Sequence, residues 1–261
     1  MPKWWRHRYC LSAAAFAAWW LTNPVTARAG ENAWQYSTIA ALMAGAYHGA
    51  LTAGELKRHG DFGLGTFNAL DGEMIVLDSR VWQVRASGNP AEASDSVGVP
   101  FAVVTRFARG IKIDLPAGLN MAGLADFLDG LTGDSSLVGA VRIDGRFAQM
   151  QVRSVKAQTR PYLPLSEVLA RDQVVFDLVD AEGVLVGFRF PGNFSGVNVA
   201  GWHLHFISAD RRAGGHVLEL ITGQAQATLN PVTSLEIQLL LNGRNGAAGS
   251  LPSGALLRAV E

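Results

Sequence analysis

The stretch GWHLHFISADRRAGGHVLEL, residues 201–220, predicts two β-strands joined by a turn. Strand-forming segments cover 202–208 and begin again at Val217, and the residues between Ala209 and Gly215 favour a turn. The turn brings the chain back, so that a return strand starting at His216 lies beside the first strand. This stretch therefore indicates an antiparallel sheet in the C-terminal half of the chain.

The sequence around this pair of strands also favours strands. From residue 174 onward the further expected strands cover 174–178, 184–190, 217–222, 225–229 and 235–241. The last residues, from 241 on, are rich in glycine and lack periodicity, so they form either a flexible tail or a strap that returns to the body. The C-terminal half is therefore expected to be strand-rich and barrel-like.

The N-terminal half mixes helices with strands. An alanine-rich run over 37–46 predicts a helix that ends near Gly49. Thr52 and Glu55 have the spacing of a capping box, which predicts a short helix ending by Gly60. Apolar residues at helical spacing predict a helix over 120–131, and a last short helix is expected over 165–171.

Strands are expected over 74–77 and 81–84, across a turn at 78–79, and over 101–107. Asp144-Gly145 lies between two strand-forming runs, 137–143 and 147–155, and predicts a two-residue hairpin. The whole pattern predicts an α+β fold with two-layer mixed and antiparallel sheets. We expect an N-terminal mixed domain over 30–160 and a β-rich, metal-binding domain over 161–261.

Composition excludes several classes of protein. The chain has 261 residues, 22 basic and 22 acidic side chains, and 49% hydrophobic residues. These values are not those of a disordered tail, a collagen-like fibre or a strongly basic nucleic-acid binder. A single cysteine, Cys10, excludes an internal disulfide and a cysteine-based zinc site.

The first 29 residues have the three parts of a secretory signal peptide. Lys3, Arg6 and Arg8 form a basic start, an apolar run covers 11–21, and small residues surround Arg28. We expect cleavage after Ala29 and export of the mature chain to the periplasm or the medium. A short membrane anchor is the alternative, although eleven apolar residues are fewer than the roughly 20 that span a bilayer.

Three of the six histidines lie within fourteen positions, at His203, His205 and His216. Residues i and i+2 of a strand point to the same face, so His203 and His205 present their imidazoles together, and His216 joins them from the return strand. Three imidazole nitrogens can then converge about 2 Å from a divalent metal and leave coordination positions open, as catalytic sites do. The alternative is that these are ordinary buried or surface histidines.

Other signals are interpreted as structural. His48 and His59 are expected to face solvent without a partner. Gly60, Gly63 and Gly65 resemble a phosphate loop, but we expect no strand before them and no helix directly after them, so they are interpreted as backbone turns. Arg211-Arg212 is expected at the tip of the hairpin as a solvated turn.

Four segments resemble the acetolactate decarboxylase family. They are GWHLHFISADRRAGGHVLEL (201–220), GDFGLGTFNALDGEMI (60–75), QYSTIAALMAG (35–45) and QTRPYLPL (158–165), and the likeness extends from Trp34 to Leu240. The resemblance implies a zinc enzyme, and a dimer, that converts the small molecule 2-acetolactate to acetoin and carbon dioxide. From the charge balance we expect no nucleic-acid partner, and because no segment of the mature chain is expected to cross a membrane we expect no membrane partner after cleavage.

The resemblance also implies roles for individual residues. Metal ligands fall on His203, His205 and His216. Glu73 corresponds to the glutamate of the family's LDGE segment, Thr66 to the threonine of its GLGT segment, and Arg153, in QVRSV, to the active-site arginine expected after the central hairpin. A second glutamate from the family's tail falls on Glu261, in LRAVE.

The implied chemistry leaves electrons beside a carbonyl group, as an enediolate, which a metal would stabilise as a Lewis acid. Arg153 fits the carboxylate or the developing oxyanion, and the proton donor is either Glu73 with a raised pKa or a water on the metal. From their positions alone, Glu73 would be a turn residue and Arg153 an exposed strand residue. Two other classes compete: a cupin-like metal oxygenase, which also uses His-x-His on a strand, and an exported binding module with a structural metal.

Overall fold

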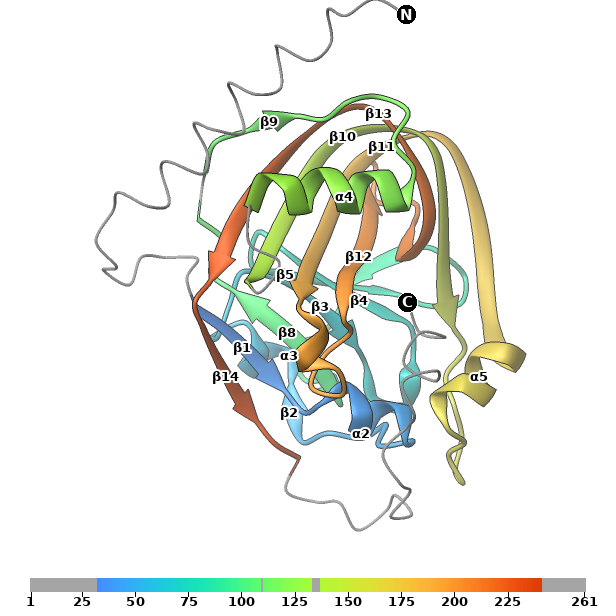
Figure 1. The fold of residues 1–261 in the computed structure, drawn as a ribbon. Helices are drawn as coiled ribbons and strands as arrows, with labels where there is room; N and C mark the ends of the chain where they lie inside the picture. The colour runs from blue at the N-terminus through green and yellow to red at the C-terminus, as the bar shows by residue number, and fades with distance from the viewer. Residues whose placement is uncertain (1–31, 109, 133–136, 241–261) are drawn as a thin grey trace, which may run out of the picture.

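Two β-sheets pack face to face in this protein (Figure 1). The computed structural model describes residues 32–108, 110–132 and 137–240. Buried residues from both sheets, among them Phe62, Ile75, Val186 and Phe188, form one hydrophobic cluster between them. The expected α+β fold with layered sheets is confirmed.

Within the described residues, the first sheet has seven strands in the order β14-β1-β8-β3-β4-β5-β6. Neighbouring strands are antiparallel except for β1 and β14, which pair in parallel. The short strands β2 (Leu51–Thr52) and β7 (Gly98–Val99) form a separate pair. The strands of the first sheet are β1 (Asn32–Tyr36), β3 (Phe62–Thr66), β4 (Glu73–Leu77), β5 (Arg80–Val84), β6 (Pro90–Glu92), β8 (Phe101–Thr105) and β14 (Ser234–Gln238).

The second sheet curls on itself. Its strands follow the order β10-β11-β12-β13-β9, and β10 also pairs with β13, which closes a ring of four strands. This closure is the barrel-like arrangement expected from the sequence. The strands are β9 (Ile113–Asp114), β10 (Val138–Val155), β11 (Gln173–Phe190), β12 (Gly201–Ser208) and β13 (Gly214–Val232).

The hairpin expected at Asp144-Gly145 is wrong, because β10 continues straight through it. Asp144 lies opposite Val184 of β11 and Gln226 of β13, so the chain has a partner strand on both edges. The pairing with β13 shifts in register just after Gly145, which marks a bulge in the strand rather than a reversal of the chain. In the same way, the strand pairs expected over 174–190 and 217–229 are each one long strand.

The turns expected at Gly63 and Gly65 are also wrong, because both residues lie inside β3. A Cβ atom at Gly63 would lie 2.3 Å from the carbonyl oxygen of Val103, and one at Gly65 would lie 2.4 Å from that of Phe101. Glycine is therefore needed here for the close approach of β3 and β8, not for a turn.

Four α-helices of the described chain cover the sheets: α2 (Ile39–Met43), α3 (Ala53–Leu56), α4 (Met121–Thr132) and α5 (Leu165–Asp172). The capping box of Thr52 and Glu55 is present at the start of α3. α4 lies across the curled second sheet, whereas α2 and α5 lie near the ends of the strands (Figure 1). The helix expected over 37–46 is shorter than predicted, because α2 begins after the N-cap Thr38 and ends before Gly45, whose φ is +93°.

Strands on each side of the boundary expected near residue 160 belong to a sheet formed mainly by the other half of the chain. β10 precedes it but belongs to the second sheet, and β14 follows it but pairs with β1 in the first sheet. The division into two domains stays a prediction. The expected signal peptide and Glu261 lie outside the described residues, within which no helix is long and apolar enough to cross a membrane.

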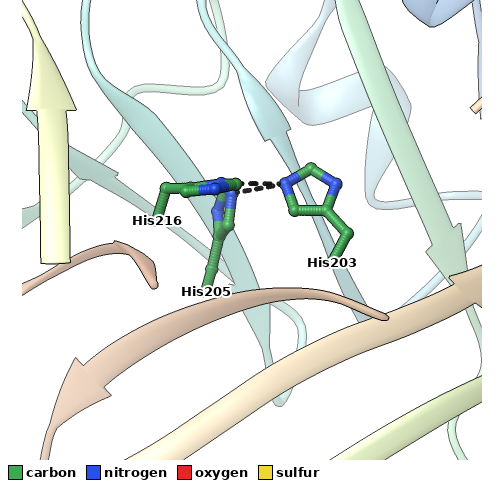
Figure 2. A group of neighbouring side chains, drawn as sticks. All are labelled: His203, His205 and His216. Atoms are coloured by element: carbon green, nitrogen blue, oxygen red, sulfur yellow. Dashed lines mark hydrogen bonds between the residues drawn. The ribbon is translucent and has the colours of Figure 1, made fainter. Parts of the chain in front are cut away.

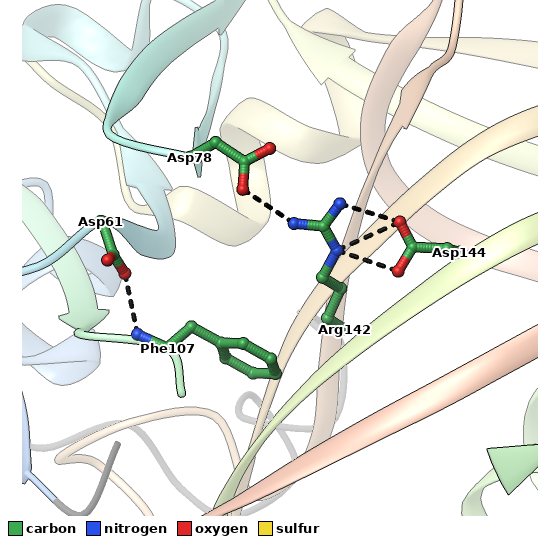
Figure 3. Close-up of polar contacts among 5 residues, drawn as sticks. All are labelled: Asp61, Asp78, Phe107, Arg142 and Asp144. Atoms are coloured by element: carbon green, nitrogen blue, oxygen red, sulfur yellow. Dashed lines mark hydrogen bonds and ion pairs between the residues drawn. The ribbon is translucent and has the colours of Figure 1, made fainter. Parts of the chain in front are cut away.

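A cleft of about 850 Å³ opens between the sheets at one end of β3, β4 and β10. Arg142 of β10 lies at its edge and binds Asp144 and Asp78, each through contacts of 2.8 Å (Figure 3). On the other side of the cleft, Asp61 accepts a 2.8 Å hydrogen bond from the backbone N–H of Phe107. We call this region the Arg142 cleft.

Candidate metal centre

Strand geometry brings the three histidines together at the other end of the sheets. His203, His205 and the core residue Ile207 alternate along β12, so their side chains share the face that looks toward the first sheet. His216 lies directly opposite His205 in the pairing of β12 with β13. The return strand predicted from the sequence is therefore confirmed.

The imidazole rings converge on one point (Figure 2). Nε2 of His203 lies 3.1 Å from Nε2 of His205 and 3.1 Å from Nδ1 of His216. The three candidate ligand atoms all lie within 4.8 Å of one another. Nitrogens bound about 2.0–2.1 Å from a tetrahedral zinc ion lie about 3.3–3.4 Å apart, so the spacing of these rings fits a single ion.

The backbone of the first sheet fixes the orientation of His205. Its Nδ1 donates a 2.8 Å hydrogen bond to the carbonyl oxygen of Met74 in β4. With the proton on Nδ1, the lone pair of Nε2 points to the place where the three rings meet, as in metal sites whose histidines are held by an outer hydrogen bond. Because the acceptor is a backbone oxygen, this contact cannot be predicted from the residue types in the sequence.

Burial keeps the three imidazoles neutral. Their exposed fractions are 8%, 1% and 4% for His203, His205 and His216. Desolvation, the main cause, lowers the pKa of His205 to about 4 and holds the pKa of the other two well below the usual value, with Arg153 acting in the same direction. Neutral imidazole is the form that binds a metal, so the group is suited to hold one near neutral pH.

Glu73 and Thr66 reach the same place from the first sheet. They lie opposite each other in the pairing of β3 with β4, and Glu73 shares its face of β4 with the core residues Ile75 and Leu77. An oxygen of Glu73 lies 3.6 Å from Nε2 of His205. Burial raises the pKa of Glu73 to about 7, against the opposing effect of Arg153. Glu73 is therefore buried in the site and not the turn residue that its position after Asp71-Gly72 suggested.

The hydroxyl proton of Thr66 is directed to the segment that connects β3 and β4. Its Oγ1 donates a 2.8 Å hydrogen bond to the carbonyl oxygen of Gly72, so the lone pairs of the oxygen are what it can offer to a ligand. This bond also holds together the segment between β3 and β4 and thereby helps to place Glu73.

Arg153 comes from the far end of β10, opposite His216 of β13. It is buried, with 5% of its surface exposed, so the alternative of an exposed strand residue is wrong. Desolvation lowers its pKa, and the nearby charge of Glu73 raises it. Because a guanidinium keeps its proton even under such conditions, it places a fixed positive charge beside the histidines.

These side chains line one small cavity of about 40 Å³. Its polar wall is formed by the three histidines together with Glu73, Arg153 and Thr66. The apolar wall was not predicted from the sequence, in which the apolar spacing of the short helices α2 and α5 was a signal for four of its six residues. That wall is formed by Ile39, Leu42, Leu70, Phe101, Leu165 and Leu169.

The remaining residues considered in the sequence lie outside this cavity. His48 is exposed, as expected, but Nε2 lies 2.5 Å from the hydroxyl oxygen of Tyr162, so the expectation that it has no partner is wrong. His59 is also exposed, as expected, but it stacks on Trp34 with ring centroids 3.7 Å apart, so the expectation that it has no partner is wrong as well. Arg211 lies at the tip of the β12–β13 hairpin, over the ring of Trp82.

Comparison with known proteins identifies the family. Residues 33–245 match the family model of alpha-acetolactate decarboxylase. The alpha-acetolactate decarboxylase of Klebsiella aerogenes is 41% identical over 230 residues, which cover 87% of this chain and 88% of that protein. The corresponding protein of Methanosarcina mazei is 40% identical over 223 residues, covering 85% of this chain and 77% of the relative.

Solved structures agree with this match. The crystal structure of alpha-acetolactate decarboxylase from Bacillus subtilis strain 168 superimposes with a TM-score of 0.82 at 30% identity, and the match covers 88% of this chain and 97% of that one. Family model, relatives and fold all lead to one conclusion: this chain belongs to the alpha-acetolactate decarboxylase family, a family of carboxy-lyases.

Proposed function

We propose that this protein binds a divalent metal at His203, His205 and His216 and decarboxylates 2-acetolactate to acetoin. The observation that carries the proposal is the joining, in one cavity, of three neutral imidazoles with a buried carboxyl group and a buried guanidinium. Family membership supplies the reaction class. It also disfavours the cupin-like oxygenase and the binding module with a structural metal.

In the proposed reaction, the bond between the carboxylate carbon and C2 breaks, and its electron pair moves into the neighbouring ketone to give an enediolate. A metal bound by the histidines would supply Lewis-acid stabilisation of the negative charge that develops on the substrate oxygens. Arg153 would bind the carboxylate through its planar fork and orient the bond that breaks. Carbon dioxide leaves, and one proton added to C2 completes acetoin.

Among the residues that the structure describes, Glu73 is the group best placed to move that proton. Its carboxyl group lies in the cavity beside His205 and is fixed on one face, so a proton delivered from it would reach one side of a planar enediolate. Thr66 would accept a hydrogen bond from the substrate hydroxyl, since its own proton is donated to Gly72.

The direct test is to incubate the purified, metal-loaded protein with 2-acetolactate and to measure acetoin and carbon dioxide above the rate without enzyme. Equal amounts of both products support the proposal. Consumption of oxygen with a redox-active iron would instead indicate an oxygenase. Glu73→Gln should lower turnover by about 100-fold or more with little change in melting temperature, and a normal rate would remove Glu73 from the mechanism.

We propose zinc as the metal, because three nitrogen ligands and an open position are typical of catalytic zinc. Metal analysis of protein purified without added ions tests this choice. Titration of the metal-free protein with Zn²⁺, followed by melting temperature, gives a measure of binding that does not depend on activity.

Glu261 is proposed as a second glutamate of the site, on the strength of the family likeness alone. Deletion of the last few residues should then lower turnover while leaving metal binding unchanged. Unchanged turnover would remove Glu261 from the mechanism.

Two further proposals concern the chain as a whole. We propose that it is exported after cleavage behind Ala29, which N-terminal sequencing of the mature protein tests. We also propose that it forms a homodimer, and the molar mass measured by light scattering distinguishes a dimer from a monomer.

A further inference from the structure

The connection between β3 and β4 has an unusual backbone directly before Glu73. Ala69 and Leu70 have φ values of +62° and +53°, in the left-handed region that favours glycine. The N–H of Asp71 closes a tight turn around them through a 3.4 Å hydrogen bond to the carbonyl oxygen of Asn68. Asparagine and glycine are usual at the two central positions of such a turn, because a Cβ atom makes this conformation costly. The turn is therefore strained, and contacts from outside it must hold it in place.

Main-chain hydrogen bonds hold the middle of this turn, residues 68–71, which we call the Ala69 turn. The N–H of Ala69 donates a 2.7 Å hydrogen bond to the carbonyl oxygen of Tyr47. The carbonyl oxygen of Ala69 accepts a hydrogen bond of 2.7 Å from the N–H of Gln158. These two bonds leave the last residue of the turn, Asp71, to be held by other contacts.

Within the described residues, three side chains bind the end of the connection, Asp71 and Gly72. Thr66 binds the carbonyl oxygen of Gly72, but it lines the cavity and already has a part in the proposed reaction. Arg85 binds the carboxylate of Asp71 at 2.8 Å, but its side chain is 53% exposed, so water competes for this ion pair. The third side chain is that of Gln83 in β5, which does not line the cavity.

Gln83 holds Asp71 through two hydrogen bonds. Gln83 is 3% exposed, and its Nε2 donates to the backbone carbonyl oxygen of Asp71 and, at 3.0 Å, to a carboxylate oxygen of the same residue. The contact therefore fixes both the main chain and the side chain of Asp71. Gln83 lies opposite Met74 in the pairing of β4 with β5, next to the pair of Glu73 and Val84. The clamp thus stands on the strand that pairs with Glu73.

We propose that Gln83 is a positioning residue of the decarboxylation: by binding Asp71 it holds the Ala69 turn in its strained conformation and thereby fixes the carboxyl group of Glu73 in the cavity. This inference rests on the proposed function. Strain and clamp act against each other, so without Gln83 the turn relaxes toward ordinary backbone angles and moves Glu73 out of place. A carboxyl group that is no longer fixed leaves the enediolate to be protonated by water from either side.

The test measures the rate at which acetoin forms and the excess of one enantiomer in the product. Gln83→Met keeps the length of the side chain and removes both hydrogen bonds. The kcat should fall by about tenfold while KM changes by less than about twofold, because Glu73 acts in protonation and not in binding the substrate. The enantiomeric excess should fall as well. If Gln83→Met does not fold, Gln83→Asn draws the amide back from Asp71 and should change both values in the same direction.

Thr105→Val is the matched control. The hydroxyl of Thr105, fully buried in the same sheet, donates a 2.7 Å hydrogen bond to the carbonyl oxygen of Asn32 and lies away from the cavity. Gln83→Met and Thr105→Val both leave a backbone carbonyl without a buried donor, and each should lower the melting temperature by about 2–8 °C. Only Gln83→Met should change kcat and the enantiomeric excess.

A second substitution separates positioning from stability. Ala69→Gly allows the φ of +62° without strain, so the turn keeps its conformation with less help from Gln83. Combined with Gln83→Met, it should restore most of the lost kcat and enantiomeric excess, although neither hydrogen bond is regained. Such a restoration is not expected if Gln83 only stabilises the fold.

The outcomes separate this inference from the function on which it rests. An active wild type whose kcat and enantiomeric excess are the same in Gln83→Met and in Thr105→Val would overturn the inference alone. A double variant that regains nothing, or a racemic product from an active wild type, would overturn it too. A wild type that forms no acetoin from 2-acetolactate would overturn the proposed function as well.

Discussion

Of the two cavities between the sheets, the smaller one holds the more deeply buried ionisable groups. The Arg142 cleft is the larger, at about 850 Å³ against about 40 Å³ for the metal centre, and both lie along the same strands β3, β4 and β10. In the Arg142 cleft the arginine is paired: Asp144, chiefly through hydrogen bonds, and Asp78 hold the pKa of Arg142 above its usual value. In the metal centre, burial lowers the pKa of all three histidines and so favours their neutral form.

The difference teaches what marks a chemical site in this fold. In the large cleft, Arg142 is paired with two partly exposed carboxylates, so it has little interaction left to offer a ligand. In the small cavity, imidazoles and a carboxyl group are desolvated beside a buried guanidinium, an arrangement that costs stability unless a ligand completes it. The volume of a cavity is therefore a poor guide here, and desolvated groups that converge are a good one.

The largest effect is expected from the metal ligands. His203→Ala, His205→Ala or His216→Ala should each lower turnover by at least about a thousandfold, because the stabilisation of developing charge is lost with the metal. Metal content after dialysis and turnover of the same preparation are the measurements. A folded variant that keeps its metal but loses turnover, or an active variant without metal, would contradict the prediction that turnover depends on a metal held by the histidines.

A smaller but clear effect is expected from Arg153. Arg153→Lys keeps the charge but loses the planar fork, and turnover should fall by about 100-fold. Arg142→Lys is the matched control, since it changes the same residue type on the same strand at the other cavity. Equal losses in both variants would show that the two ends of β10 do not differ in function.

Acid should destabilise the metal-free protein through the histidines. Because folding lowers the pKa of each histidine, to about 4 for His205, the unfolded chain binds more protons below about pH 6.5. Stability should then fall as the pH decreases from 6.5 toward 4. Glu73, whose pKa is raised to about 7, acts in the opposite sense but is one group against three. Urea titrations at several pH values in the presence of a chelator measure this slope, and a flat or rising stability toward pH 4 would contradict it.

The smallest effect is expected at the Arg142 cleft. Arg142→Ala removes its ion pairs to Asp144 and Asp78, whose side chains are 35% and 68% exposed, so the free energy of unfolding should fall by about 1 kcal/mol or less. Turnover should not change. Urea unfolding and the acetoin assay check both statements, and a loss of turnover would assign the cleft a part in the reaction.

The long strands show where sequence patterns fail. Asp144-Gly145 has the composition of a tight turn, and as an isolated segment it would form one. In the folded chain, β11 and β13 offer hydrogen-bond partners on both edges of β10, and this pairing outweighs the local preference. The expectation of turns at Gly63 and Gly65 is wrong for a related reason, since glycine is needed there by a neighbouring strand about forty residues away in the sequence.

The sequence by itself determined the histidine group, because the two-residue period of a strand and one short hairpin suffice to bring His203, His205 and His216 together. Only the tertiary structure decided that Glu73 and Arg153 join them from another sheet and another strand, that the carbonyl oxygen of Met74 orients His205, and that two short helices close the cavity. The reason is physical: a local pattern sets which face a side chain takes, whereas distant strands meet only when burial of their apolar faces packs the sheets together.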